Sequence, residues 1–430
     1  MSEIDAAAAA AALRDRFIPI RKADILDALI EQGALADSGE RDKFRRLCTM
    51  LASIYHYQYF AALERLRDDY YYFNPDVTPH AAMDHARLES SYADLVCSLD
   101  AALKSANFVE LAHAEVGEAH RRRAVLPVEV TAPLDDFREV RFYRRGHHVE
   151  VFMVPYWFGL RRRKLEAVVY DDVVLFAAMK SQAEIAAREM RRLSRRKLRP
   201  GSVLLKCFRN IAAGDLNALF PNARVVMSGK DKLVLGVPAI AGGIPILLKI
   251  YATITVLFLL LGFYFGVGAA MEDSDTKTAL AALSGLVALG GFAARQVMKY
   301  QRQSLKYQIE LTDNIYYRNV NNNAGVFDYV IGAAEEQECK EAFLAYHFLH
   351  TAASPLTAGE LESRIEAWLK TTFAVDIEFE VGDALGKLER LRLIGRRGER
   401  LFVPPLDEAL AALAYAWDGF FAAERRDAGK

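Results

Sequence analysis

The stretch from Tyr251 to Arg295 reads YATITVLFLLLGFYFGVGAAMEDSDTKTALAALSGLVALGGFAAR, with two uncharged runs on either side of a short acidic segment. From Ile250 to Ala270 there are 21 residues without a charge, and as a helix they would span about 30 Å, the hydrocarbon thickness of a bilayer. Residues 278–294 add 17 more, at the short end of the spanning range. The stretch therefore predicts a two-helix transmembrane hairpin rather than one buried helix of a soluble core.

The basic residues around these two runs predict the orientation of the hairpin. The connecting segment holds one lysine, whereas the outer flanks hold seven basic residues: Lys230, Lys232, Lys249, Arg295, Lys299, Arg302 and Lys306. By the positive-inside rule, both flanks and both termini would be cytoplasmic. We therefore expect an integral protein of a bacterial-type inner membrane, or of the mitochondrial inner membrane in a eukaryote. Residues 233–249, which are apolar but interrupted by Pro and Gly, would lie at the interface or enter the membrane partway.

The composition argues against several other classes of protein. A net charge of −1 over 430 residues gives no global attraction to nucleic acid. The four cysteines are scattered and form no CxxC pair, so no zinc ribbon is indicated. The chain lacks the phosphate loop, GxGxxG, HExxH and GxSxG motifs, and we therefore predict no catalytic residue, no metal ligand and no cofactor. His113, Glu115 and His120 are explained equally well by a solvent-facing helix.

The periodicity of apolar residues divides the chain into five regions. We expect a helical N-terminal region, an antiparallel β-rich domain, the apolar lead-in and hairpin, a helical polar segment, and a C-terminal winged-helix-like α+β domain, over residues 1–115, 125–232, 233–300, 301–350 and 351–430. In the second region, short alternating strands are joined by turn signals, one of them at His147 and His148. The expected fold class is therefore an α+β membrane protein.

The C-terminal region has the order of a winged helix. Thr357 is a plausible cap for a first helix, a second helix follows from Val381, and GRRGERLFVPPLD resembles a hairpin-like wing. Residues 351–430 hold 11 basic and 14 acidic residues, whereas DNA-binding domains usually carry a basic excess. We therefore expect this domain to contact another protein, and we regard nucleic acid as an unlikely partner.

Two groups of polar residues are candidates for binding. The first lies after the hairpin and comprises Asp313, Asn314, Arg318, Asn321, Asn322 and Asp328, although turn formation and helix capping explain the asparagines as well. The second is a basic run next to a predicted membrane, where it would contact lipid headgroups: Arg188, Arg191, Arg192, Arg195, Arg196, Lys197 and Arg199. A solvated helix face is the alternative for this run.

Several stretches together resemble an uncharacterised membrane family, the domain-of-unknown-function family 3754, which includes transmembrane protein 143-like members. They extend from about Arg14 to Tyr346 and include RFIPIRKADILDAL, YYYFNPD, MVPYWFGLRRRKLEAVVYDDVVL, PGSVLLKCFRNI, LGVPAIAGGIPIL and ELTDNIYYRNVNNNAGVFDYV. The resemblance implies a multi-pass membrane protein with large soluble flanks. It brings no known activity and therefore transfers no catalytic residue.

These observations favour a non-enzymatic, membrane-anchored scaffold or regulator with large cytoplasmic domains. Its partners would be membrane lipid and, through the C-terminal domain, another protein. A homo-oligomeric pore or solute conduit is one alternative, although neither apolar run carries an ionisable residue. A membrane-associated enzyme whose site assembles from distant residues is the other.

Overall fold

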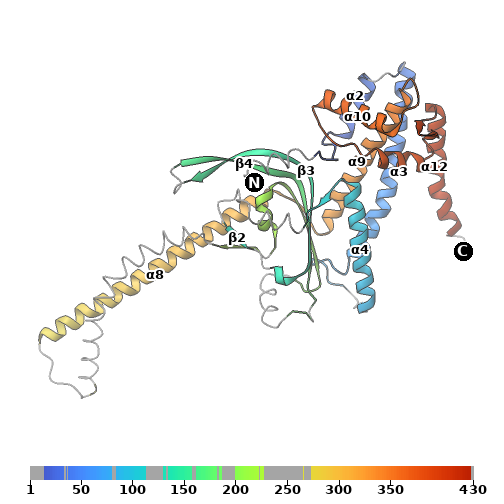
Figure 1. Cartoon of the computed structure of the whole chain (residues 1–430). Helices are drawn as coiled ribbons and strands as arrows, with labels where there is room; N and C mark the ends of the chain where they lie inside the picture. Colours follow the sequence, from blue (N-terminus) through green and yellow to red (C-terminus); the bar gives the residue numbers. More distant parts are fainter. Residues whose placement is uncertain are drawn as a thin grey trace. The chain divides into compact units, whose positions relative to one another are not determined.

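The computed structural model describes residues 14–32, 35, 37–79, 84–112, 129–131, 134–156, 161–181, 184–185, 199–221, 223–226, 265 and 273–427. They form an α+β structure with antiparallel sheets, as the alternating pattern predicts (Figure 1). The chain divides into two compact units. The first combines Met1–Val125, Pro133–Leu216 and Arg318–Lys430, and the second combines Leu126–Ala132 with Asn217–Tyr317.

A five-stranded sheet organises the first unit. Its strands, in spatial order, are β1 (Val109–Glu110), β3 (Phe137–Tyr156), β4 (Arg161–Met179), β5 (Val203–Ala212) and β7 (Asn319–Asn322). Every pair of neighbours is antiparallel. Two short 3-10 helices, η1 (Leu134–Asp136) and η2 (Ala213–Leu219), precede β3 and follow β5.

The turn predicted at His147 and His148 is absent, because β3 runs through both residues as one continuous strand. Gly146, just before them, has a φ of +64°, and a Cβ at this position would collide with the carboxylate of Asp171 on β4. The glycine therefore allows a local left-handed conformation and a close approach within the strand. The prediction was wrong because this signal marks a local irregularity rather than a chain reversal.

Three helices cover one face of this sheet: α3 (Ser38–Tyr70), α4 (His85–Ser105) and α9 (Ala324–His350). Alternate residues of β4 and β5 point into the core between sheet and helices, namely Val174, Phe176, Ala178, Val203, Leu205 and Cys207. This is the period-2 pattern of a strand with one face on a helical layer. The expected helices around residues 44–55 and 85–103 are confirmed as parts of α3 and α4.

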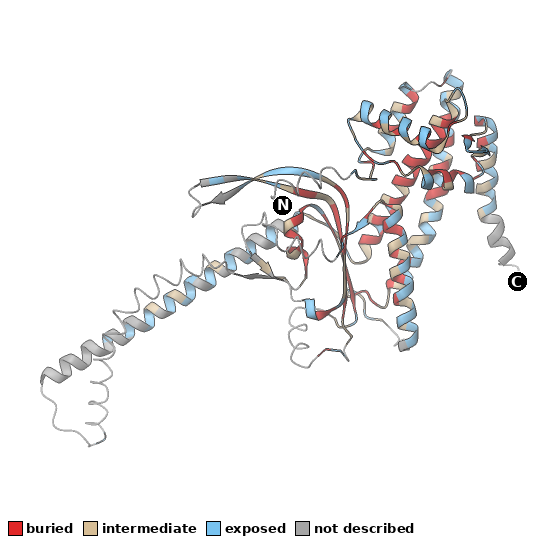
Figure 2. Cartoon of the chain, viewed as in Figure 1, coloured by how far each residue is buried: buried red, intermediate tan, exposed pale blue. Residues whose placement is uncertain are grey.

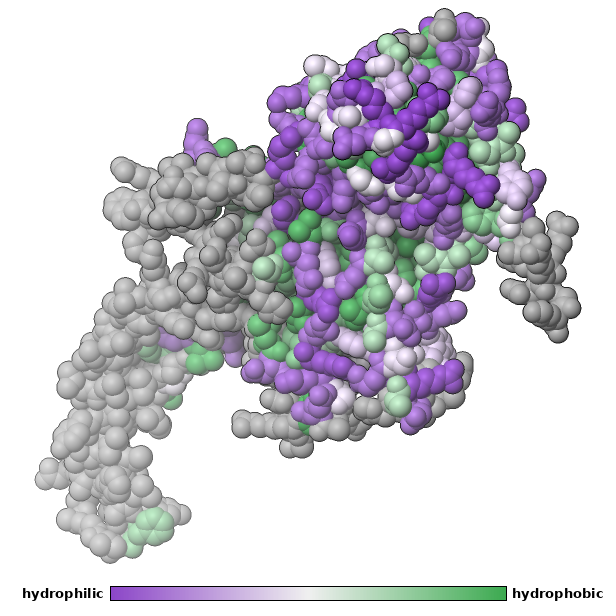
Figure 3. Space-filling view, turned by 45° about the vertical axis from the view of Figure 1, so that its right-hand side comes forward, coloured by the Kyte–Doolittle hydropathy of each residue, from purple (hydrophilic) through white to green (hydrophobic). Residues whose placement is uncertain are grey.

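A second core lies among helices of the same unit. It is built by the other half of α3 with α2 (Lys22–Gln32), α10 (Ala358–Phe373), α11 (Val381–Arg390), α12 (Leu406–Asp427) and a hairpin of β8 (Gly395–Arg397) and β9 (Arg400–Phe402). Thr357 caps α10, and a reciprocal bond with Glu360 completes the capping box, so the predicted cap is confirmed. Figure 3 shows hydrophilic side chains predominating on the outside of this part, around α2 and α10.

Helix α9 belongs to both cores of the first unit. Its first half packs in the core under the sheet through Val326, Phe327 and Val330, and its second half packs in the helical core through Phe343 and Tyr346. Figure 2 shows buried residues recurring along this helix. Its inner positions are therefore tied to the sheet at one end and to the C-terminal helices at the other.

The asparagine-rich segment before α9 differs from the prediction of a tight turn or cap cluster. Asn319–Asn322 form strand β7, which pairs with β5 at the edge of the sheet. Asn323 is the N-cap residue of α9, but its side chain makes no capping hydrogen bond. Its side-chain amide instead donates to Asp76. Pairing with β5 overrides the low strand propensity of asparagine.

The second unit contains a two-stranded sheet, β2 (Glu129–Thr131) with β6 (Arg224–Val226), and the helix α8 (Asp273–Tyr316). The predicted second span, residues 278–294, lies within α8, which continues beyond it through Arg295, Lys299 and Arg302. The expected helix after Arg295 is thus confirmed.

The prediction of a membrane protein is corrected by the helices themselves. Among the described residues, none of the helices combines the length and the apolar character needed to cross a bilayer. This finding contradicts the transmembrane hairpin, the membrane part of the fold class and the inner-membrane location. The first predicted span, 250–270, lies outside the described residues except for Phe265, and the lead-in 233–249 lies wholly outside them.

Candidate functional site

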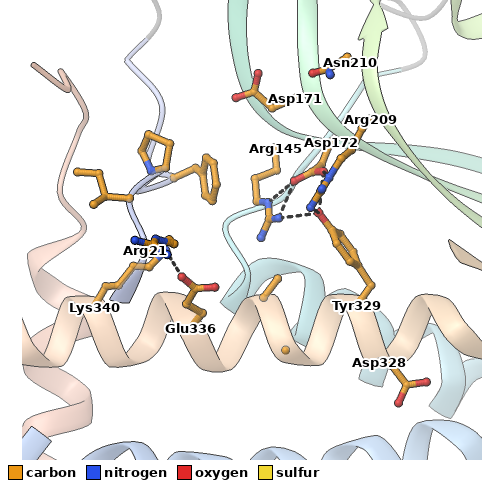
Figure 4. A pocket seen from close by; sticks show the side chains of 15 residues that line it. Arg21, Arg145, Asp171, Asp172, Arg209, Asn210, Asp328, Tyr329, Glu336 and Lys340 are labelled. Atoms are coloured by element: carbon orange, nitrogen blue, oxygen red, sulfur yellow. Dashed lines mark hydrogen bonds and ion pairs between the residues drawn. The ribbon is translucent and has the colours of Figure 1, made fainter. Parts of the chain in front are cut away.

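A cavity of about 530 Å³ in the first unit is the candidate site (Figure 4). It lies between strands β3, β4 and β5, one face of α9 and the extended segment that precedes α2. Its lining residues are Phe17, Pro19, Ile20, Arg21, Arg145, Asp171, Asp172, Arg209, Asn210, Asp328, Tyr329, Gly332, Ala333, Glu336 and Lys340.

The register of the sheet places three charged residues in a row across the strands. Arg145 of β3 lies opposite Asp172 of β4, and Asp172 lies opposite Arg209 of β5. Directly opposed residues of antiparallel strands point to the same face, so the carboxylate stands between two guanidinium groups. The row therefore forms one charged cluster at the edge of the cavity.

Tyr329 of α9 completes this cluster from the helical side. Its hydroxyl donates to Asp172 Oδ1 at 2.7 Å and accepts from one terminal nitrogen of Arg145 and one of Arg209, each at 3.2 Å. Arg145 donates to Asp172 Oδ2 through Nε at 3.1 Å and Nη2 at 2.6 Å, and Arg209 Nε donates to Oδ1 at 3.2 Å. Figure 4 shows the four side chains converging from β3, β4, β5 and α9.

The cluster is buried on one side and open on the other. The side chains of Arg145 and Asp172 are 7% and 6% exposed, whereas that of Arg209 is 57% exposed. Burial, reinforced by the charge of Asp172, raises the pKa of Tyr329 to about 12. The phenol therefore keeps its proton at neutral pH and acts as a hydrogen-bond donor, which makes it a poor general base.

Aromatic rings hold the Arg145 guanidinium in place. Its central carbon lies 4.5 Å from the ring centroid of Phe17 and 4.7 Å from that of Phe108. A cation between two ring faces gains electrostatic attraction that grows as water is excluded. The segment before α2 is thereby joined to the strand that carries Arg145.

The other end of the cavity is a second polar group, built on α9. Lys340 Nζ donates to the carbonyl oxygen of Ile18 at 3.1 Å and lies 3.0 Å from Glu336. The Gln337 amide also donates to this carbonyl and accepts from the backbone N–H of Ile18. Burial lowers the pKa of Lys340, and the Glu336 carboxylate opposes that effect. These bonds fix the course of residues 17–21 along the helix.

Small residues form the floor between the two polar groups. Gly332 and Ala333 occupy the turn of α9 between Tyr329 and Glu336. A Cβ added to Gly332 would meet no heavy atom within 4 Å. The glycine therefore leaves open space into which a side chain at this position would extend.

Of the first predicted site group, only Asp328 lines the cavity. It forms a 2.7 Å ion pair with Arg67 of α3. Arg318 donates to the Asn210 carbonyl and Asn321 to the Gly325 carbonyl, which are structural bonds at the sheet edge. Asn322 lies in β7, while Asp313 and Asn314 belong to α8 in the second unit. One residue of this predicted group, Asp328, therefore takes part in the candidate site.

The second predicted group falls largely outside the described residues. Arg188, Arg191, Arg192, Arg195, Arg196 and Lys197 all lie there. Arg199 is described, and its guanidinium donates to the backbone carbonyls of Tyr72, Asn74 and Val77. Its contacts are those of a residue that holds the loop after α3 against the start of β5.

Sequence reasoning missed Arg145, Asp172, Arg209 and Tyr329. The available signal was a charged pair, Asp171–Asp172, inside a strand whose following residues, VVLFAAM, are apolar. A charge within a buried strand calls for a partner, but the pattern does not say which residue supplies it. In the part of the chain that the structure describes, no cluster of three or more His, Cys, Asp and Glu side chains is placed to hold a metal ion. His113, Glu115 and His120 lie outside that part.

Comparison with known protein families gives a match for part of the chain. Residues 170–325 match the profile of a family described as "Protein of unknown function (DUF3754)". This match supports the resemblance to that family over a stretch that contains Asp172 and Arg209 but neither Arg145 nor Tyr329. No solved structure matches the chain.

Proposed function

We propose that the protein is a non-enzymatic scaffold or regulator that binds a ligand in the α9 cavity. The supporting observation is that α9 packs in two cores and carries the cavity where it passes from one to the other. A ligand that contacts Tyr329 at one end and Glu336 at the other would bias the packing of the helix against both cores. Binding at the cavity would then alter the C-terminal helices.

The partner surface in this proposal belongs to α10, α11 and the β8–β9 hairpin, and the partner is a protein. The acidic excess of residues 351–430 favours a protein over nucleic acid. The high pKa of Tyr329 and its bonded state favour binding over catalysis. We also propose that the resemblance to the same family continues on both sides of residues 170–325 and includes its transmembrane protein 143-like members.

The test fills the cavity and observes the C-terminal partner. Gly332→Trp places a ring in the cavity, and Gly290→Trp is the matched control, because Gly290 also lies within a helix with nothing within 4 Å of its Cβ. Crosslinking with mass spectrometry in native cells would record the proteins joined to α10 and α11. We expect the wild type and Gly290→Trp to share one set of neighbours and Gly332→Trp to lose or change it. Identical neighbours in all three would defeat the regulatory proposal.

A further inference from the structure

Two arginines of the cavity converge on a single hydroxyl. A terminal nitrogen of Arg145 and one of Arg209 each lie 3.2 Å from the Tyr329 oxygen, so the two nitrogens are at most twice that distance apart. Among the described residues, Asp172 is the one carboxylate that accepts hydrogen bonds from both guanidinium groups. Because Tyr329 is neutral, this cluster carries one unbalanced positive charge.

The other acidic residues of the lining contact other partners. Asp171 Oδ1 lies 2.7 Å from His148 Nδ1, which is a cation only when the ring is protonated, Asp328 lies 2.7 Å from Arg67, and Glu336 is paired with Lys340 at the far end. Figure 4 shows Asp328 directed away from the arginine cluster. Asp328 and Glu336, which have cationic partners, therefore compete weakly for Arg145 and Arg209.

One terminal nitrogen of Arg209 is available as a hydrogen-bond donor. Its Nε donates to Asp172 and its Nη2 to Tyr329, whereas Nη1 has no hydrogen-bond partner among the described residues. With its side chain 57% exposed, the group faces accessible space. A guanidinium presents a planar fork of N–H groups that matches a carboxylate or a phosphate.

Part of the cavity wall suits an apolar body. Phe17, Pro19 and Ile20 line one side, and Gly332 and Ala333 form the floor. A volume of about 530 Å³ lies in the range of small-molecule sites and exceeds what an inorganic anion alone would fill. A charged head on Arg209 would leave an attached ring or chain against this wall.

We propose that the cavity binds a small organic anion, a carboxylate or a phosphate monoester, with its head on Arg209 beside Tyr329 and its apolar body over Gly332. This assignment rests on the proposed function, namely that the α9 cavity is a ligand site. To that function it adds the negative charge of the ligand and the residue, Arg209, that binds the charged group.

The experiment uses ligands that share one ring and differ in the head group. Calorimetry measures the binding to the purified full chain of benzoate, phenyl phosphate, benzyl alcohol and benzylamine. Acetate and inorganic phosphate serve as anions that lack the ring. We expect benzoate or phenyl phosphate to bind more tightly than benzyl alcohol, and benzylamine not to bind. The tighter of the two anions decides between carboxylate and phosphate.

Variants locate the binding and separate the two claims. Arg209→Gln should lower the affinity for the anion by about ten- to a hundredfold, as expected for the loss of a charged hydrogen bond. Arg396→Gln is the control, because Arg396 is 55% exposed, similar to Arg209, but lies on β8 outside the cavity lining. Gly332→Trp should abolish binding of every member of the series.

The outcomes distinguish this inference from the proposed function. If benzylamine or benzyl alcohol binds best and Gly332→Trp blocks it, the cavity is a ligand site but the anion assignment is wrong. If an anion binds and Arg209→Gln leaves its affinity unchanged, the assignment is also wrong. If no compound binds at millimolar concentration, both claims fail.

Discussion

Lys387 of α11 lies with its Nζ 2.6 Å from Glu341 Oε2 of α9, and the two side chains are 1% and 4% exposed. The same ammonium lies 2.7 Å from Asp383 and 3.5 Å from Glu338. Burial alone would lower the pKa of Lys387, but the three carboxylates raise it above its ordinary value. One buried cation thus joins the C-terminal helices to the helix that carries the cavity.

Replacing this lysine should destabilise the first unit strongly. In Lys387→Met the cation is lost and Glu341 is left as an uncompensated buried charge, which typically costs about 3–5 kcal/mol of unfolding free energy. Urea unfolding at pH 7 measures the change. Lys370→Met is the control, because Lys370 is 66% exposed in its pair with Asp376 and should cost no more than about 1 kcal/mol. Equal effects of the two substitutions would contradict the role given to Lys387.

His347 should make stability depend on pH. Burial, assisted by the neighbouring His350, lowers the pKa of His347 from its ordinary 6.5 to about 4. Between these two pKa values the unfolded chain binds a proton that the folded chain does not bind. The contribution of His347 to the free energy of unfolding is therefore complete above pH 6.5 and is lost as the pH falls towards 4. The slope is about 1.4 kcal/mol per pH unit within that window, or about 2 kcal/mol between pH 6.5 and pH 5.

His347→Phe tests this linkage directly. Nδ1 of His347 is buried and has no hydrogen-bond partner in the described part of the chain, and the ring packs edge-on against Phe44, so phenylalanine should keep the packing. The pH dependence of urea unfolding should then be flatter than in the wild type by about the amount stated above. Parallel curves for the two proteins between pH 6.5 and pH 5 would show that another group titrates.

Two glycines should respond in opposite directions to alanine. Gly146→Ala forces a left-handed residue with a Cβ against Asp171, and the conformation alone costs about 1–2 kcal/mol. Gly332→Ala fills open space within a helix and should gain up to about 1 kcal/mol. Thermal unfolding of both variants measures the signs. A loss of stability in Gly332→Ala would mean that the floor of the cavity is tighter than the structure has it.

Only one of the four cysteines should react rapidly in the folded protein. Cys97 is exposed, whereas Cys48, Cys207 and Cys339 are buried. Burial also raises the pKa values of Cys207 and Cys339 to about 12, which leaves almost no thiolate at pH 7.5. A thiol-reactive dye should label one site quickly and all four in denaturant. Cys97→Ser should remove the fast phase, and fast labelling that survives this change would contradict the burial of the other three.

Much of the local structure could be predicted from short-range patterns. The helical spacing of Phe44, Leu47 and Leu51 predicted part of α3, and Thr357 marked the start of α10. These predictions were confirmed because a helix repeats every 3.6 residues and its end groups are satisfied within one turn. The alternating runs likewise indicated strands, although not that two of them form one strand through Gly146.

The incorrect predictions came from features that several structures share. The small, uncharged residues 278–294 suited a membrane span, but they form part of a helix that continues through charged residues to Tyr316. The asparagines of 319–322 suited a turn, but pairing with β5 makes them a strand. In both cases a local pattern was compatible with two environments, and for the asparagines the pairing with a distant strand decided between them.

By itself, the sequence determined the long helices and the strands with an alternating pattern, and that the C-terminal region orders two helices before a hairpin. Only the tertiary structure brought Arg145, Asp172, Arg209 and Tyr329 together and opened a cavity beside them. The reason is that strand register and the packing of α9 join residues up to 184 positions apart in this cluster. Such pairings depend on the whole arrangement of the sheet and helices, and no periodicity within one segment records them.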